Sequence, residues 1–168
     1  CQWANHMGAT VIGTVGSEDK AALAKANGCH HVINYRTEDF VARVAEITGG
    51  KKCAVVYDGV GKDTFMKSLD CVRPRGLVAL FGNASGKVEP LDLGLLAAKG
   101  SLFVTRPTLD THAATREDLV MTANSLFDVV RSGVVKIEIN QTYALKDAAQ
   151  AHRDLEGRKT TGSTVLLP

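Results

Sequence analysis

Residues 11–28, VIGTVGSEDKAALAKANG, decide the fold. Their apolar start, Val11 to Val15, predicts a buried strand, and the polar turn after it leads into an Ala-rich helix. Ser17 is placed to cap the first turn of that helix, and Gly28 suits the left-handed position that ends one. A strand, a turn, a helix and a glycine stop therefore occupy about twenty residues.

The same unit recurs along the chain. Apolar strands alternating with amphipathic helices predict a parallel sheet covered by helices on both faces, because right-handed crossovers place them there. The fold class is therefore α/β, with a doubly wound, Rossmann-like parallel sheet. Strands are predicted over 11–15, 31–35, 53–57, 76–81, 101–105 and 164–167, and helices over 1–7, 20–26, 63–70, 91–98, 115–131 and 144–155, with a further helix capped by Thr37.

The helix over 115–131 opens on Thr115-Arg116-Glu117-Asp118, which resembles a capping box. Its apolar residues at helical spacing predict a contribution to the core. These candidates are Leu119, Met121, Leu126, Val129 and Val130.

Composition excludes several classes of protein. The 168 residues are 45% hydrophobic and 23% charged, as expected for one globular domain with a sizeable core. Twenty Lys and Arg against 18 Asp and Glu are scattered along the chain, so no nucleic-acid partner is expected. No apolar run approaches a membrane span, and no membrane partner is expected.

The cysteines and histidines indicate no special chemistry. The four cysteines form no C-x-x-C pair, which favours reduced thiols and a cytoplasmic location. The five histidines lack metal spacing with the cysteines, so no metal site is predicted. No G-x-S-x-G motif supports a hydrolase.

Ligands of open parallel sheets bind at the carboxyl ends of the strands, so the loops there are the candidate site. In the first loop, Gly16-Ser17 stands where NAD-binding folds carry an acidic residue. Lys20 lies in the first helical turn, where a bound phosphate would favour its charge. Ser17, Lys20 and the helix amides could hold the 2′-phosphate of NADP. Alternatively, Ser17 only caps the helix and Lys20 is solvated.

Three further loops carry candidate binding residues. Tyr35 could stack near an adenine or bind a phosphate, or be a structural tyrosine. The glycines around Val60 would let a flat ring approach the backbone, or simply form a tight turn. Phe81-Gly82-Asn83 allows the same approach, with Asn83 able to read a carboxamide or a ribose, although an ordinary loop also explains it.

Taken together, these motifs resemble the cofactor-binding half of the medium-chain dehydrogenase/reductase superfamily, and closely its zinc-independent NADPH:quinone oxidoreductases related to zeta-crystallin. The resemblance extends over all 168 residues, and the order and spacing of its segments make it specific. They are Gly13-Thr14-Val15-Gly16-Ser17, Val32-Ile33-Asn34-Tyr35-Arg36, Val55-Val56-Tyr57-Asp58-Gly59-Val60-Gly61, Phe81-Gly82-Asn83-Ala84-Ser85-Gly86, Gly100-Ser101-Leu102 and Tyr143-Ala144-Leu145-Lys146-Asp147-Ala148-Ala149, followed by Ala151-His152 and 155–167.

The resemblance assigns roles to the candidate residues. It implies that Gly16, Ser17, Lys20 and Tyr35 bind the NADPH 2′-phosphate, with Arg158 as an additional phosphate ligand. It implies that Gly59, Val60, Phe81, Gly82 and Asn83 line the ribose and the nicotinamide. Gly59 stands where many members of the family carry Ser, so one hydroxyl contact is expected to be lost.

The resemblance also implies a domain organisation and a function. Residues 1–168 are expected to form a partial NADP-binding domain without its first strand and Gly-rich loop. The C-terminal helix and strand would lead back to a GroES-like catalytic domain that is absent here. The chain opens on Cys1 inside a predicted helix, so we expect it to be part of a longer enzyme and inactive alone.

The implied reaction is hydride transfer from NADPH to a quinone or a similar electron acceptor. The alternatives are an enoyl or alkenal reductase of the same superfamily, or a non-catalytic nucleotide-binding module. The strand over Ser101 to Thr105 is expected to pair with its copy in a homodimer, because an apolar outer strand is otherwise prone to aggregation.

Overall fold

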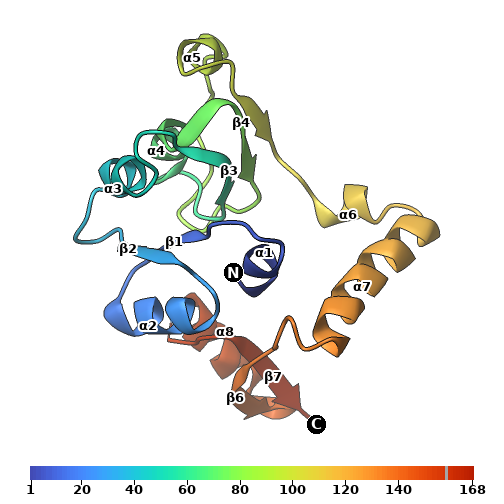
Figure 1. The fold of residues 1–168 in the computed structure, drawn as a ribbon. Coiled ribbons are helices and arrows are strands. Elements are labelled where there is room, and N and C mark those ends of the chain that lie inside the picture. Colours follow the sequence, from blue (N-terminus) through green and yellow to red (C-terminus); the bar gives the residue numbers. More distant parts are fainter. Residues whose placement is uncertain (158) are drawn as a thin grey trace.

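The computed structural model describes residues 1–157 and 159–168, in which strands and helices alternate (Figure 1). In chain order the elements are α1 (Gln2–His6), β1 (Ile12–Val15), α2 (Glu18–Ala26), β2 (His31–Asn34), α3 (Phe40–Ile47), β3 (Cys53–Asp58), α4 (Phe65–Asp70), β4 (Val72–Leu80), α5 (Gly94–Ala98), β5 (Phe103–Thr105), α6 (Leu109–His112), α7 (Arg116–Arg131), β6 (Ile139–Ala144), the 3₁₀ turn η1 (Leu145–Asp147), α8 (Ala148–Glu156) and β7 (Ser163–Leu167).

The strands pair in parallel, which confirms the predicted α/β class. They form three sheets, of order β1-β2, β3-β4-β5 and β6-β7. Doubly wound dinucleotide folds run 3-2-1-4-5-6. The first two sheets reproduce this order with strand 1 left out, because β2-β1 corresponds to 3-2 and β3-β4-β5 to 4-5-6. Among the described strands the sheet is therefore divided between β1 and β3.

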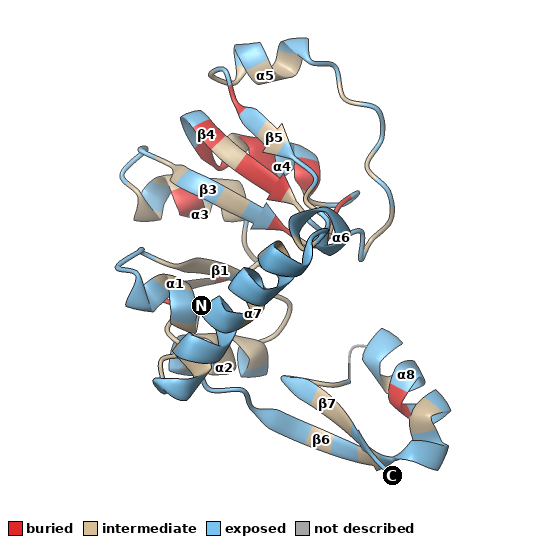
Figure 2. Cartoon of the chain, turned by 90° about the vertical axis from the view of Figure 1, so that its right-hand side faces the viewer, coloured by how far each residue is buried: buried red, intermediate tan, exposed pale blue. Residues whose placement is uncertain are grey.

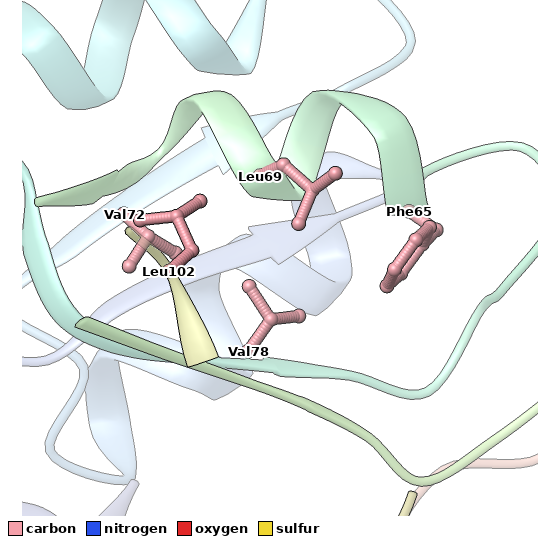
Figure 3. Close-up of a cluster of buried hydrophobic side chains, with 5 residues drawn as sticks. All are labelled: Phe65, Leu69, Val72, Val78 and Leu102. Carbon is pink, nitrogen blue, oxygen red and sulfur yellow. The ribbon is translucent and has the colours of Figure 1, made fainter. Parts of the chain in front are cut away.

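Two clusters of buried side chains hold this arrangement together. The first packs α4 against β4 and the segment before β5, and Figure 3 shows its side chains converging. The second joins Ile33 of β2, Val44 of α3 and Cys71, with Ile12 and Cys53 packed against them. Because its members come from both β1-β2 and β3-β4-β5, this second cluster connects the two sheets across their division. The first cluster consists of Phe65, Leu69, Val72, Val78 and Leu102.

The predicted core contribution of α7 is wrong in part. The helix forms as expected, with Thr115 Oγ1 accepting from Asp118 N over 3.1 Å, but none of its residues is buried. Leu119, Met121 and Leu126 are exposed, while Val129 and Val130 are half-buried. Figure 1 shows α7 standing apart from the sheets, and Figure 2 shows most of its ribbon coloured as exposed. The apolar periodicity therefore predicts the helix correctly, but no hydrophobic core of the described residues covers its apolar side chains.

β4 begins earlier than predicted, at Val72 rather than residue 76. Val72 pairs with Cys53 and Leu77 with Val55, so the residues between them bulge out of the ladder. Pro74 lies in this bulge, where its missing N–H removes no ladder bond. Arg75 there has a φ of 58° and donates its N–H to Gly100 O over 2.8 Å.

Other boundaries also differ. The strand β6 was not predicted, and it pairs with the expected terminal strand β7. β5 is shorter than the predicted 101–105, because Ser101 has a φ of 55° and Leu102 turns into the core. α3 is capped by Asp39, whose Oδ1 accepts from Val41 N over 3.1 Å, and not by Thr37.

The C-terminal part is tied to the rest through Gln2. Its amide Nε2 donates to Asn27 Oδ1 and to Lys136 O, and its Oε1 accepts from Lys136 N over 2.6 Å. One side chain of α1 thereby satisfies both backbone groups of Lys136, just before β6. Among the described helices, none has the length and apolar character needed to cross a membrane.

Candidate functional site

The ends of β1 and β2 bring Gly16 and Tyr35 together. Val15 pairs with Asn34, and Tyr35 N donates to Val15 O over 3.1 Å. A Cβ placed on Gly16 would lie 2.9 Å from the Tyr35 hydroxyl and 3.4 Å from Arg36 Nε. The absence of a side chain at residue 16 therefore lets a phenol and a guanidinium approach the same stretch of backbone.

Ser17 and Lys20 begin the helix next to this point. Ser17 is the N-cap of α2, and its Oγ accepts from Lys20 N over 3.5 Å. The predicted cap is therefore present, and the hydroxyl proton of Ser17 remains a donor for a ligand. Lys20 is half-buried and lines a cavity of about 540 Å³ with Trp3 of α1 and Thr161.

One acidic residue of this turn, Glu18, is hydrogen-bonded to the end of β2. Glu18 Oε1 accepts from Asn34 Nδ2 over 3.0 Å, and this bond draws its carboxylate toward β2. Arg36 belongs to the motif Val32-Ile33-Asn34-Tyr35-Arg36, but it is not among the site residues predicted from the sequence. Its place beside Gly16 adds a second cation to the group, and its position directly after Tyr35 was the available signal.

Arg158, the additional phosphate ligand implied by the resemblance, lies outside the described residues. Hydrogen bonding lowers the pKa of Asp154, through Gln150 above all and also through Tyr143 and Lys159. Tyr143 OH donates to Asp154 Oδ2 over 3.0 Å, and this bond raises the pKa of Tyr143. The bond from Tyr143 to Asp154 joins β6 to α8.

A second group of predicted residues lies at the ends of β3 and β4, where two loops pack backbone on backbone. Ala84 N donates to Gly59 O over 3.3 Å, and Ser85 N donates to Val60 O over 2.8 Å. A Cβ on Gly82 would lie 2.2 Å from Gly59 O, so residue 82 must be glycine for the loops to meet in this way.

Phe81 and Asn83 carry the side chains of this second group. A Cβ on Gly59 would lie 2.9 Å from Phe81 Cζ, so the exposed Phe81 ring lies over the space that a serine would occupy. Asn83 satisfies both ends of its amide when Nδ2 donates to Gly82 O and Oδ1 accepts from Arg106 Nη2 over 3.2 Å. Arg106 Nη1 also donates to Leu80 O over 2.8 Å. A ligand that hydrogen-bonds to the Asn83 amide would replace one of the bonds that this amide makes to Gly82 O and Arg106.

Neither Cys53 nor Cys71 is an activated nucleophile. Burial raises the pKa of the Cys53 thiol and raises that of Cys71 to about 12. Both thiols are therefore protonated at neutral pH. In the part of the chain that the structure describes, no three His, Cys, Asp or Glu residues are grouped to hold a metal ion.

Comparison with known proteins identifies the family. The sequence model of one family, described as zinc-binding dehydrogenase, matches residues 1–119. The chain belongs to this family. Among its relatives, a quinone oxidoreductase from Pseudomonas aeruginosa is 56% identical over 168 residues, covering 100% of this chain and 52% of the relative.

Other members of the zinc-binding dehydrogenase family match as well. The crystal structure of an Escherichia coli quinone oxidoreductase complexed with NADPH has a TM-score of 0.95 and 54% identity, covering 100% of this chain and 52% of that one. A 2-haloacrylate reductase from Burkholderia is 52% identical, covering 99% of this chain and 50% of the relative. These matches confirm the resemblance to quinone oxidoreductases, and the chain spans about half the length of the curated relatives it matches.

Proposed function

We propose that this chain is the cofactor-binding part of an oxidoreductase that passes hydride from NADPH to a quinone. The observation that carries the proposal is the convergence of Tyr35 and Arg36 on Gly16, beside the start of α2 where Ser17 and Lys20 lie. The similarity to a quinone oxidoreductase complexed with NADPH supports it.

The residues around Gly16 fit a phosphate monoester. The Ser17 and Tyr35 hydroxyls can donate hydrogen bonds, and Lys20 and Arg36 supply positive charge. The first-turn amides of α2 favour an anion. We propose that this group, with Arg158 as a further ligand, holds the 2′-phosphate and so selects NADPH over NADH.

The second group would hold the other end of the cofactor. We propose that Gly59, Val60, Phe81, Gly82 and Asn83 line the ribose and the nicotinamide, which supplies the hydride when bound. The packed backbones of the two loops would form a rigid surface beneath the nicotinamide end of the cofactor. The exposed Phe81 ring can move aside because only its far end lies over Gly59.

The chain is proposed to act together with a second half. Its relatives are about twice as long, and β1 and β3 lie at a division of the sheet. In this proposal residues 1–168 form a partial NADP-binding domain, and a GroES-like domain completes the acceptor pocket. We further propose a homodimer formed along β5 and a cytoplasmic location, the latter supported by four free cysteines.

One relative favours a second candidate function. The 2-haloacrylate reductase from Burkholderia is nearly as similar as the quinone oxidoreductases. An electron-poor alkene is therefore the alternative acceptor. Rates with a quinone and with a 2-haloacrylate, measured on the complete enzyme, separate the two.

The test of cofactor choice is kcat/KM with NADPH and with NADH in the complete enzyme. A charge-assisted contact contributes roughly 1.5 to 3 kcal/mol, so Lys20→Ala should lower the preference for NADPH by about 10- to 100-fold. Lys25→Ala, in the last turn of the same helix, removes an equal charge and should leave the preference unchanged. Equal kcat/KM for both nucleotides in the unmodified enzyme would refute the proposal.

A further inference from the structure

Asp58, the last residue of β3, is a buried carboxylate surrounded by donors. Its side chain is only 4% exposed. Oδ1 accepts from Val60 N over 2.9 Å and from Gly61 N over 3.0 Å. Thr64 Oγ1 bonds both carboxylate oxygens at 2.9 Å, and Ser68 Oγ donates to Oδ2 over 2.8 Å. Every described contact of the carboxylate is a hydrogen bond that it accepts.

These bonds fold the turn that follows β3. Val60 and Gly61 are drawn back over the strand end, where Gly61 adopts a φ of +88°. The backbone of Asp58 extends the link, because its carbonyl accepts from Phe81 N over 2.9 Å. One residue therefore fixes the conformation of the Gly59–Gly61 turn and joins it to the loop after β4.

Burying a carboxylate is costly, and a structure tolerates it where the charge is fully hydrogen-bonded. No ion pair with a cation within 4.0 Å is found for Asp58 among the described residues, so backbone amides and hydroxyls carry this compensation. The hydrogen bonds of Asp58 define the conformation of Gly59 to Gly61, two of which are glycines with no side chain to pack.

We propose that Asp58 is a positioning residue that presents the Gly59–Gly61 turn to the ribose and nicotinamide end of the cofactor. It acts through the turn and touches no reacting atom. This inference rests on the function proposed above, in which the 2′-phosphate is held separately, at Gly16.

The experiment compares two ligands on the complete enzyme. NADPH uses both ends of the site, whereas adenosine 2′,5′-bisphosphate lacks the nicotinamide and its ribose. Dissociation constants for both are measured by titration calorimetry, with the melting temperature of each variant recorded. Asp58→Ala should weaken NADPH binding by about 10-fold or more and change binding of the bisphosphate by less than about 2-fold.

Two variants sharpen the result. Asp58→Asn should restore NADPH affinity to within about 3-fold, because its Oδ1 still accepts from the backbone and its Nδ2 can donate to the Ser68 hydroxyl. Asp63→Ala removes a charge of the same sign from an exposed position near the turn and should change neither constant. If Asp58→Asn loses as much affinity as Asp58→Ala, the carboxylate acts by its charge and the positioning role is refuted.

Other outcomes are equally decisive. A folded Asp58→Ala variant with a lower melting temperature but unchanged NADPH affinity would show a purely structural role. If Asp58→Ala does not fold, Thr64→Val decides, with an expected loss for NADPH alone of about 3-fold or more. Unchanged NADPH binding in Thr64→Val would refute the inference. An unmodified enzyme that binds neither ligand would refute the proposed function itself.

Discussion

The contact between the two loops predicts losses of stability of different size for two glycines that lie against each other. In Gly82→Ala the new Cβ would fall 2.2 Å from Gly59 O and 2.8 Å from Gly59 C and Cα. In Gly59→Ala the new Cβ would meet only the Phe81 ring, 2.9 Å from Cζ. The first change presses on backbone, and the second on the end of an exposed side chain.

The size of each effect follows from what must move. Cβ atoms essentially never approach closer than 3.0 Å, so Gly82→Ala must part the loops by about 0.8 Å or more. Such a shift stretches the hydrogen bonds between them, including the 2.8 Å bond from Ser85 N to Val60 O. We expect Gly82→Ala to lower the free energy of unfolding by about 2 to 3 kcal/mol. Gly59→Ala should cost less than about 1 kcal/mol, because the Phe81 ring can rotate away.

Urea denaturation followed by far-ultraviolet circular dichroism measures both values. The two variants add the same methyl group, so volume and hydrophobicity are matched. Equal losses of stability, or a larger loss for Gly59→Ala, would refute the view that the loops meet through their backbones.

Three further predictions concern other parts of the fold. Burial raises the pKa of the Cys71 thiol from 9.0 to about 12. Above pH 9 the thiol therefore ionises in the unfolded chain but stays protonated in the folded one. This difference should lower the free energy of unfolding by about 1.4 kcal/mol per pH unit as the pH rises toward 12. Urea titrations at several pH values should show this slope. It should be shallower in Cys71→Ala, where only other groups with a raised pKa, such as Cys53, still titrate. Gln2→Ala removes the amide that bonds both backbone groups of Lys136. Hydrogen exchange at the Lys136 amide should therefore accelerate by about 5-fold or more. An unchanged rate would contradict the view that Gln2 ties Lys136 to α1. Phe103→Glu places a charge on the free edge strand β5 and should convert a dimer into monomers, as judged by light scattering at micromolar concentration, whereas a monomeric unmodified protein would refute the proposed dimer.

Local signals in the sequence were sufficient for most of the Rossmann-like part. The cap at Ser17 and the glycine with φ of +86° at residue 28 bracket α2 as the residues suggested. Apolar runs located β1, β2 and β3, although the structure leaves Val55 and Tyr57 of β3 exposed, so this strand is not covered on both faces as the run suggests. The resemblance grouped Gly16 with Tyr35, and the structure gives the physical reason, since the neighbouring parallel strands β1 and β2 end on the same edge.

The failures arise where the signal is not local. The polar residues of β6, such as Asn140 and Gln141, conceal a strand whose partner β7 lies some twenty residues further along the chain. The apolar stripe of α7 indicates a helix that can be buried, but its spacing cannot show whether a surface lies opposite. The role of Asp58 could not be predicted from its motif, because it depends on a donor from α4, Ser68, that meets the carboxylate only in the fold.

At the junction of the two loops, the atoms that hold the loops together differ from the side chains that would meet a ligand. The hydrogen bonds between the loops are made by main-chain atoms and by the Ser85 hydroxyl, while the Asp58 carboxylate holds the first loop from within. Phe81 is exposed, and the Asn83 amide bonds only Gly82 O and Arg106. The side chains of residues 81 and 83 can therefore be exchanged while the hydrogen bonds between the two loops stay intact.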